Sequence, residues 1–585
     1  MKKTIAGLLC AVLLAGCASN AEAPTVAAVT PTEGASTAAP SVEAPPQSFC
    51  GTMAVSEEGI PFASRFSGET AIVLSDEGIT VDGGGETDAV FTSHDIIYYE
   101  DREAYESGNP YGEGTDADKH SADEAAAHTV VNITAPGTYR VSGTLSAGQI
   151  RVDLGEDAFN DPEAVVELIL DNADITCTVA PAVLFLNVYE CDNAWSADTA
   201  KSSVDTSGAG ANLILEGENT VSGSYVAKIF KDKEGEKKLW KQDGAIYSYM
   251  SLNVFGPGAL TLNAANEGLD TELHLTVNGG KIAIFSDNDG INTNEDGVSV
   301  TTVNGGRLHI TAGLGAEGDG IDSNGWLVIN GGTVVSSANP AADAGLDSDM
   351  GSYVNGGTVI ALGSTMDWAE SDSSQVTMNL QFAAQQKGDR AIVVTKEDGT
   401  VLFAYDPGED EILGQERRSY MGAIVSCPGF AVGESCLVYL GGSLTGSETG
   451  GVYTDVTGYE GGVQMQYTGN DLRGGFGGFP GGQMPEGMEP PEGFDGQRPE
   501  GGMGTPPDWN GEMPTMPEGE TFPQGQPPEG FEGQEPPEGF DGQRPQGGFG
   551  KGDREQGGIP EGPANTRFLL ADKVNAFSGV TEVQQ

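Results

Sequence analysis

A repeat of 25 to 26 residues in the middle of the chain limits its possible folds more than any other feature. Each copy begins with Asn-Gly-Gly, and the four starts are Asn278, Asn304, Asn330 and Asn355. A unit this short cannot bury its apolar face alone, so neighbouring copies must stack and share one core. The repeat therefore predicts a solenoid.

Short strands are expected on both sides of each Asn-Gly-Gly. Alternating residues such as Lys281–Ile284 follow the turn, and runs such as Trp326–Ile329 precede it. Such alternation is typical of strands with one buried face, and Asn-Gly-Gly supplies the positive φ angles of a tight turn. This pattern matches one coil of a right-handed parallel β-helix, so we predict an all-β fold of that type. The shorter periods of other β-solenoids and the leucines of a leucine-rich repeat are absent.

The N-terminus resembles an export signal. Lys2 and Lys3 precede an apolar stretch that is too short to span a membrane. The sequence Leu14-Ala15-Gly16-Cys17 resembles a bacterial lipobox, which predicts lipidation of Cys17 and anchorage to the cell envelope or cell surface. The alternative is an ordinary signal peptide with a chance cysteine.

Composition divides the rest of the chain, because the apolar periodic segments alternate with segments that have little to bury. We predict a lipoprotein signal peptide at 1–17, a flexible tether at 18–48, the parallel β-helix at 49–365 with an inserted loop at about 88–127, a β-rich cap at 366–470, a disordered Gly/Pro/Glu-rich segment at 471–563, and a C-terminal segment at 564–585 that docks on the cap.

The net charge of −59 argues against nucleic acid as a partner and favours cations. We expect a monomer whose only membrane contact is the lipid anchor. Cysteines 177 and 191, like 427 and 436, either form local disulfides in an exported chain or remain buried thiols. The isolated histidines His274 and His309 are expected at the surface.

A second phrase recurs after the repeat strands. It consists of an acidic or amide residue, a glycine, an aliphatic residue and another acidic or amide residue. Its copies are Glu267–Asp270, Asp289–Asn292, Asp319–Asp322 and the degenerate Ala344–Asp347. The aliphatic residue should point into the core, and the polar residues should face outward at a turn. Equivalent positions would then stack about 4.8 Å apart, in two columns of oxygen-bearing side chains.

Stacked carboxylates repel one another unless they are protonated or hold a cation. Carboxylate, amide and turn carbonyl oxygens suit Ca²⁺, which takes six to eight such ligands. The alternative is that these residues only form turns and satisfy local backbone amides. The candidate metal ligands are Glu267, Asp270, Asp287, Asp289, Asn292, Asp296, Asp319, Asp322, Asp343 and Asp347.

Four other side chains are candidates for contact with carbohydrate. Lys281 and Arg307 fall at equivalent outward positions of adjacent coils, where they would either grip sugar carboxylates or neutralise an acidic face. Trp326 and Tyr353 also fall at outward positions, where they would either stack on sugar rings or lie under a loop.

The repeated DGI(N/D)…NGGT phrase, with GTYRVSGTLSAGQIRVDL and VVELILDNADITC before it, resembles a bacterial family of surface proteins described as carbohydrate-binding-domain-containing. The family is typified by a clostridial protein that binds cellulose and polygalacturonate. The resemblance covers about residues 70–440, and it implies a right-handed parallel β-helix with Ca²⁺ at the Asp-Gly-Ile turns. The chain departs from the pattern at Ala344, where the first acid is missing.

These observations favour a non-catalytic, calcium-dependent protein that binds acidic or β-linked glucan polysaccharide. One alternative is a calcium-dependent pectate-type lyase, for which Lys281 or Arg307 would supply the base. The other is a structural adhesin that binds protein partners through the Gly/Pro-rich segment.

Overall fold

The computed structural model describes residues 51–52, 59–99, 117–194, 196–230, 238–364, 367–408, 418–471 and 564–584. All described residues belong to one compact unit, Pro45–Gln585. The predicted signal peptide with Cys17, the tether and residues 472–563 lie outside the described residues. No helix among the described residues is long and apolar enough to cross a membrane.

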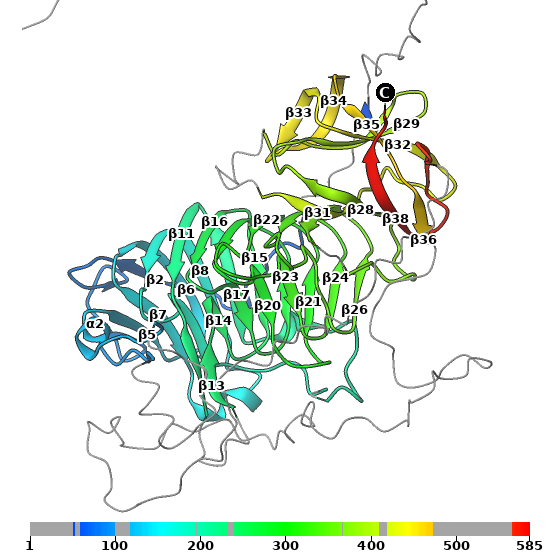
Figure 1. Ribbon diagram of the computed structural model, residues 1–585. Coiled ribbons are helices and arrows are strands. Elements are labelled where there is room, and N and C mark those ends of the chain that lie inside the picture. The colour runs from blue at the N-terminus through cyan, green and yellow to red at the C-terminus, as the bar shows by residue number, and fades with distance from the viewer. Residues whose placement is uncertain are drawn as a thin grey trace, which may run out of the picture. The chain divides into compact units, whose positions relative to one another are not determined.

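The fold is almost entirely β. Three columns of parallel strands, here called columns A, B and C, occupy the part before residue 364 (Figure 1). Column A contains β2 (Glu69–Leu74), β6 (Gly137–Leu145), β8 (Val166–Thr176), β10 (Ala211–Glu216), β15 (Leu252–Phe255), β18 (Leu275–Val277), β21 (Val300–Val303), β24 (Trp326–Ile329) and β26 (Gly351–Val354).

Columns B and C are built in the same way. Column B continues from the long strands β6 and β8 through β11 (Glu218–Gly223), β16 (Ala259–Ala264), β19 (Lys281–Ser286), β22 (Arg307–Thr311), β25 (Thr333–Ser337) and β27 (Thr358–Gly363). Column C contains β5 (Thr129–Ile133), β7 (Gly148–Asp153), β9 (Val183–Asn187), β14 (Gly244–Ser248), β17 (Glu267–Thr271), β20 (Ile291–Thr293) and β23 (Ile321–Ser323).

From β14 to β25 the chain passes through columns C, A and B in that order, and then begins again one coil further on. Each coil therefore adds one strand to each column. The aliphatic residue of the recurrent acidic phrase lies inside, as Leu269, Ile291 and Ile321 are paired in register and have no exposed surface. Each such side chain contributes about 1.5–3 kcal/mol through burial, and one core runs from coil to coil.

Asparagine side chains form a ladder along the Asn-Gly-Gly turns. The Nδ2 atoms of Asn304, Asn330 and Asn355 donate to Oδ1 of the preceding asparagine at 2.9, 3.0 and 3.1 Å. The second glycine of each turn has a positive φ, between +81° and +97°. A Cβ at Gly306 would lie 2.6 Å from the carbonyl oxygen of Gly280, so this turn requires glycine. The positive φ was predicted from the sequence, whereas the amide ladder was not.

Replacement of Asn304 by alanine tests the ladder. The substitution removes one donated and one accepted side-chain hydrogen bond, and we expect the free energy of unfolding to fall by about 1–3 kcal/mol. Urea denaturation measures the change. The matched control is Asn263→Ala on β16, where an exposed amide makes one 3.2 Å bond to Ser222 and the expected loss is below about 0.5 kcal/mol. Equal losses in the two variants would contradict a stabilising ladder.

The strands beyond residue 367 are mostly antiparallel. The last strand of column B, β27, pairs antiparallel with β31, so its outer edge is covered. The other strands here are β28 (Thr377–Gln386), β29 (Ile392–Lys396), β30 (Val401–Tyr405), β31 (Tyr420–Ser426), β32 (Ser435–Leu440), β33 (Ser443–Thr449), β34 (Val452–Glu460), β35 (Val463–Gln466), β36 (Gly469–Asp471), β37 (Phe568–Leu569) and β38 (Val574–Glu582).

The segment after residue 564 joins this antiparallel region. Strand β38 pairs parallel with β28 and antiparallel with β35 and β36, and β37 pairs with β32 (Figure 1). Tyr467, Phe568 and Phe577 stack with ring centroids 4.8–4.9 Å apart in a second apolar core. Near the other end of the chain, β1 (Gly51–Thr52) pairs with β34.

Residues 88–127, expected as an inserted loop, contain regular structure. Strand β4 (Val90–Ser93) pairs antiparallel with β5 and covers the first edge of column C. Helix α2 (Ala122–Ala126) begins with a capping box between Ser121 and Glu124. The remaining elements are β3 (Thr80–Val81), which pairs with β2, the 3₁₀ turns η1 (Glu156–Asn160) and η2 (Thr206–Gly208), and the hairpin of β12 (Val226–Phe230) and β13 (Lys238–Gln242).

Candidate functional site

Column C brings most of the predicted metal ligands together. Asp270 is paired in register with Asn292, and Asn292 with Asp322. A bridge between Ile321 and Leu346 continues this alignment to the next coil. We call the resulting row of side chains the acid ladder, and its members are Asp243, Glu267, Asp270, Asp289, Asn292, Asp319, Asp322, Asp347 and Asp367.

The members of the acid ladder are buried or half-buried, so the row is covered and does not lie at an exposed turn. Asp270 is fully buried, Glu267 is 5% exposed and Asp289 is 8% exposed. The end of β13 supplies part of the cover, because Lys241 reaches into the ladder from that strand. The repeat pattern contains no information about this cover, since the hairpin of β12 and β13 is not part of the repeat.

Two carboxylates at the first position of the acidic phrase each bind the backbone of the next coil with one oxygen. Oδ1 of Asp289 accepts from the amide N of Asp319 at 2.6 Å, and Oδ1 of Asp319 accepts from the amide N of Ala344 at 2.5 Å. These bonds support the view that the acids satisfy local backbone amides. Each bond uses only one of the two carboxylate oxygens, so the other oxygen could still bind a metal ion.

Three buried oxygens of the acid ladder accept no hydrogen bond from the described residues, namely Oε2 of Glu267, Oδ2 of Asp270 and Oδ1 of Asn292, although the Glu267 carboxyl lies within hydrogen-bond reach of the Asp270 and Asn292 side chains. A buried acceptor without a partner costs free energy, about 1–3 kcal/mol each and more for a charged group. Asp243, Glu267 and Asp270 also each have a carboxylate oxygen within 4.8 Å of the others. We call Glu267, Asp270 and Asn292 the oxygen triad.

Burial and mutual repulsion raise the pKa values of the ladder carboxyls. Burial, reinforced by Asp319 and Asp347, raises the pKa of Asp322 to about 8. Burial likewise raises the pKa of Asp319 to about 7, against a lowering hydrogen bond from Ala344. Burial and the neighbouring Asp347 raise the pKa of Asp367 to about 7.

The most buried acids shift in the same direction. The pKa values of Asp270 and Asp289 lie well above the ordinary range, first because of burial and then because of Glu267. Burial also raises the pKa of Glu267, although Lys241 opposes the shift. A row of carboxyls that resists ionisation at neutral pH favours any bound cation that removes the repulsion.

Lys241 is the one basic side chain that pairs with a ladder residue in the described part of the chain. Its Nζ lies 2.7 Å from Oδ2 of Asp243 and also donates to Oδ1 of Asn294. Nδ2 of Asn294 in turn donates to Oδ1 of Asp270 at 2.5 Å. Burial alone would lower the pKa of Lys241, but the carboxylates of Asp243 and Asp270 outweigh it and raise that pKa.

Three predicted metal ligands lie away from the buried row. Asp287 and Asp296 are exposed, and Asp296 accepts a 3.2 Å bond from Asn324. Asp343 is half-buried, and its Oδ2 accepts from the amide N of Gly318 at 2.8 Å, which is a turn-forming role. These positions flank the ladder without joining its unpartnered oxygens.

Sequence reasoning missed Lys241, Asp243 and Asp367 as members or neighbours of the site, whereas Asn294 was expected there as a neighbouring donor. Asp243 was detectable, because it stands one residue before the glycine that pairs with Glu267, just as Asp343 precedes Ala344. Asp367, whose Oδ2 accepts a 3.4 Å bond from the amide N of Ser348, follows the last repeat, so no periodic signal marks it.

The candidate carbohydrate-contacting residues separate into two groups. Lys281 is exposed on β19, and Trp326 and Tyr353 are half-buried on the outer face of column A. Val328 pairs in register with Tyr353, so Trp326 and Tyr353 are diagonal neighbours on that face. Arg307 is in register with Lys281 but is covered: it is 3% exposed and donates to the carbonyl of Thr449 at the end of β33.

Both histidines expected at the surface are buried. His274 lies 3.2 Å from Asp192 and accepts a hydrogen bond from the amide N of Val300 at 3.1 Å. His309 lies under the same turn as Arg307, because a Cβ at Gly450 would meet its ring. The four described cysteines are free thiols: Cys177, Cys427 and Cys436 are buried, as the second alternative expected, and Cys191 is half-buried.

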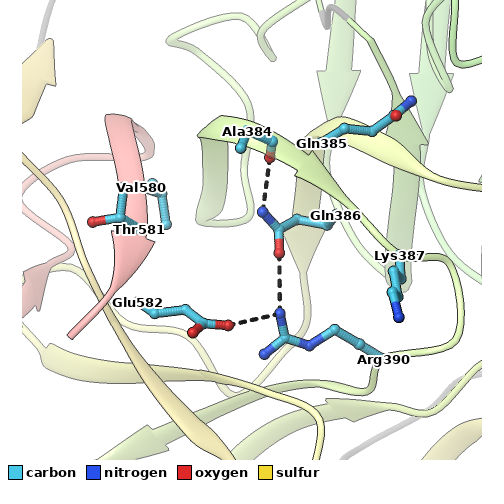
Figure 2. A pocket seen from close by; sticks show the side chains of 8 residues that line it. All are labelled: Ala384, Gln385, Gln386, Lys387, Arg390, Val580, Thr581 and Glu582. Carbon is cyan, nitrogen blue, oxygen red and sulfur yellow. Dashed lines mark hydrogen bonds and ion pairs between the residues drawn. The ribbon is translucent and has the colours of Figure 1, made fainter. Parts of the chain in front are cut away.

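A cleft of about 500 Å³ lies between the end of β28 and the end of β38 (Figure 2). The guanidinium of Arg390 donates to Oε1 of Gln386 at 3.2 Å and lies 3.0 Å from Oε1 of Glu582 (Figure 2). The amide of Gln386 donates to the carbonyl of Ala384 at 2.7 Å. Because these charges and amides already pair with one another, the cleft offers less unsatisfied polarity than the acid ladder.

The donor set of the acid ladder fits a hard cation. It contains carboxylate and amide oxygens, with no thiol or imidazole among its members, and three of its buried oxygens have no protein partner. Such donors suit Ca²⁺, whereas Zn²⁺ and other transition metals favour nitrogen and sulfur ligands. The residues present therefore fit the ion that the family resemblance implies.

Comparison with known proteins supports the resemblance drawn from the repeats. Residues 127–407 match the family model described as "carbohydrate-binding domain-containing protein". A protein of that description from Acetivibrio thermocellus is 32% identical over 174 residues, which are 29% of this chain and 51% of the relative. The chain thus spans about half the length of that curated relative.

One solved structure also matches. It is described as a gadolinium derivative of the polysaccharide lyase-like protein from C. thermocellum. The match covers 49% of this chain and 92% of the other at 20% identity, with a TM-score of 0.27. A likeness this low carries no argument about fold or chemistry.

Proposed function

We propose that this protein is a non-catalytic, cell-surface lipoprotein that binds polysaccharide through a right-handed parallel β-helix carrying Ca²⁺ in the acid ladder. The match of residues 127–407 to a carbohydrate-binding family supports the ligand class. The observation that carries the metal is the oxygen triad, because one buried oxygen of each member accepts no hydrogen bond from the described residues. Ca²⁺ there supplies positive charge to oxygens that otherwise repel one another.

Different residues of the acid ladder would supply different ligand oxygens to the ion. Glu267, Asp270 and Asn292 would provide the unpartnered oxygens of the triad. Asp289, Asp319 and Asp322 extend the same row into the next two coils, where each retains a carboxylate oxygen. Burial keeps competing water away from these oxygens, which strengthens their attraction for a cation.

Divalent cations at the acidic surface also affect which polysaccharides can approach. A chain with a net charge of −59 repels a polyuronate unless divalent ions bridge the two. Acidic polysaccharide should therefore be retained in Ca²⁺ and released by a chelator. A neutral glucan should depend less on Ca²⁺, because it has no charge to bridge.

The outer face of column A is the proposed contact surface for sugar rings. Trp326 and Tyr353 present partly exposed aromatic rings on neighbouring strands, and Lys281 is exposed on β19. An aromatic ring offers apolar area to a sugar face and keeps a polar edge in water. Arg307 is no longer part of this surface, because the turn at Thr449 covers it.

Retention on immobilised polysaccharide tests the proposal. We expect Trp326→Ala to weaken retention roughly five- to thirtyfold, which corresponds to about 1–2 kcal/mol of lost contact. The matched control is Phe285→Ala, which truncates a half-buried aromatic residue on β19 in column B. Affinity electrophoresis on cellulose and on polygalacturonate, each with Ca²⁺ and with EDTA, gives the measurement.

The same samples separate binding from catalysis. Digestion of polygalacturonate with rising absorbance of unsaturated products would contradict a non-catalytic role and indicate the lyase alternative. Loss of surface association on deletion of residues 471–563, with no retention on either polysaccharide, would indicate the adhesin alternative.

A further inference from the structure

Lys241 differs in its surroundings from the other lysines whose side chains the structure describes. Its side chain is 8% exposed, and it ends the hairpin of β12 and β13 that lies outside the repeat. The hydroxyl of Tyr249 donates to the backbone carbonyl of Lys241 at 3.1 Å. The backbone therefore holds the side chain on the row of carboxylates, and a buried ammonium requires partners there.

The ammonium uses a different set of atoms from the oxygen triad. Nζ pairs with Asp243 and donates to Asn294, which in turn binds Oδ1 of Asp270. The unpartnered oxygens of Glu267, Asp270 and Asn292 are not among its partners. One side of Asp270 is thus engaged through Asn294, while Oδ2 on the other side has no partner.

Charge at this coil is only partly balanced. Asp243, Glu267, Asp270 and Glu272 all act on Lys241, so four carboxyl groups surround one ammonium. In the next coils, the described ladder carboxyls Asp289, Asp319 and Asp322 form no ion pair at all. The ladder therefore has one position that holds a cation from the protein itself and further positions that do not.

We infer that Lys241 is a tethered counter-cation, which fills the first cation position of the acid ladder beside Asp243 and weakens divalent cation binding at the adjoining oxygen triad. Only the second part of this inference, the weakening of divalent cation binding, rests on the proposed calcium function. The ammonium neutralises Asp243 and removes it from the metal ligands, although Asp243 lies close enough to Glu267 and Asp270 to join them. A fixed positive charge next to the triad also repels an incoming divalent ion.

Two consequences follow from a tethered cation. Without metal, the protein depends on Lys241 to offset buried carboxylates, so loss of the ammonium should destabilise the metal-free fold. With metal, loss of the ammonium frees Asp243 as a ligand and removes repulsion, so affinity for Ca²⁺ should rise. If Lys241 only packs the hairpin against column C, its replacement should destabilise the metal-free fold and leave the affinity for Ca²⁺ unchanged.

The experiment compares Lys241→Met with the wild-type chain. Methionine keeps much of the length and apolar volume of the lysine stem, so the substitution mainly removes charge. In EDTA, the melting temperature should fall by several degrees. In a calorimetric titration, Ca²⁺ affinity should rise by about tenfold or more. The control is Lys201→Met, an exposed lysine outside the ladder, and neither quantity should change there.

A charge-balanced double variant provides a second readout if Lys241→Met fails to fold without metal. Lys241→Met combined with Asp243→Asn removes the ammonium and its partner carboxylate together, so net charge at the coil is conserved. A tethered counter-cation predicts that this variant folds in EDTA and binds Ca²⁺ at least as tightly as the wild type. Loss of Ca²⁺ binding would show that Asp243 is itself a metal ligand and would overturn the inference.

The results separate the inference from the function on which it rests. Unchanged Ca²⁺ affinity in Lys241→Met would overturn the inference even if the variant is less stable. If the wild type binds no Ca²⁺, the proposed metal fails, and the melting temperature in EDTA decides the remaining half. A fall in Lys241→Met that is reversed in Lys241→Met combined with Asp243→Asn would then support a tethered counter-cation, and no fall, or an equal fall in both variants, would reject it.

Discussion

The metal-free protein should be more stable at pH 5 than at pH 8.5, by on the order of 5 kcal/mol. The pKa values of Asp319, Asp322 and Asp367 are raised by burial to about 7, 8 and 7 in the folded chain. A group whose pKa is raised on folding contributes stability that is complete below its unfolded pKa. That contribution is lost as the pH rises through the folded pKa, here between about 4 and 8.

Thermal melts in EDTA across this pH range measure the effect, and we expect the melting temperature to fall by about 5 °C or more from pH 5 to pH 8.5. Saturating Ca²⁺ should cancel the fall, because the ion binds the ionised carboxylates. Asp322→Asn is the matched variant, since it removes one of the titrating groups and should flatten the pH dependence. A melting temperature in EDTA that rises with pH would contradict the burial of unpaired acids.

Asp270→Asn should abolish most of the response to Ca²⁺ while leaving the metal-free protein as stable as before, or more so. Asp270 is fully buried, and its Oδ2 has no partner, so a neutral amide of the same shape relieves repulsion when no metal is present. The same change removes a charged ligand, and we expect Ca²⁺ affinity to fall on the order of a hundredfold. Calorimetry and melting temperatures with and without Ca²⁺ give both quantities.

Asp287→Asn is the control for that variant. Asp287 was also predicted as a metal ligand, but the structure places it exposed and outside the buried row. The Asp287→Asn variant should therefore retain nearly the full Ca²⁺ response. Loss of the response in Asp287→Asn, with retention in Asp270→Asn, would place the ion on the exposed flank instead of in the buried ladder.

The repeat alone predicted the elements that are periodic. Asn-Gly-Gly marked each turn, and Leu269, Ile291 and Ile321 were identified as inward-facing before their register was known. The alignment of Asp270, Asn292 and Asp322 followed from the same period. These features were predictable because a solenoid repeats the same short-range geometry in each coil.

The features that sequence reasoning missed depend on contacts between distant segments. Lys241 comes from a hairpin outside the repeat and buries acids that alternation placed at the surface. Arg307 is covered by Thr449, which lies 142 residues further along the chain. Asp367 follows the last repeat and reaches Ser348 across a turn. Periodicity describes the coils themselves, and it contains no information about what later packs against them.

The C-terminal strands show the same limit. Their alternation correctly indicated β structure, but not how the strands pair. Strand β38 pairs parallel with β28 although nearly 200 residues separate them in the sequence, and β27 pairs antiparallel with β31. Such pairings depend on which edges remain open once the parallel columns have formed.

The most direct test is a calorimetric titration of Ca²⁺ into chelator-treated protein at pH 7.5, carried out in two buffers of different ionisation enthalpy. Binding in the acid ladder predicts at least one Ca²⁺ per chain, with release of protons as carboxyls of raised pKa ionise, and loss of that signal in Asp270→Asn. No binding at millimolar Ca²⁺, or full binding retained in Asp270→Asn, would contradict a calcium site in the buried ladder.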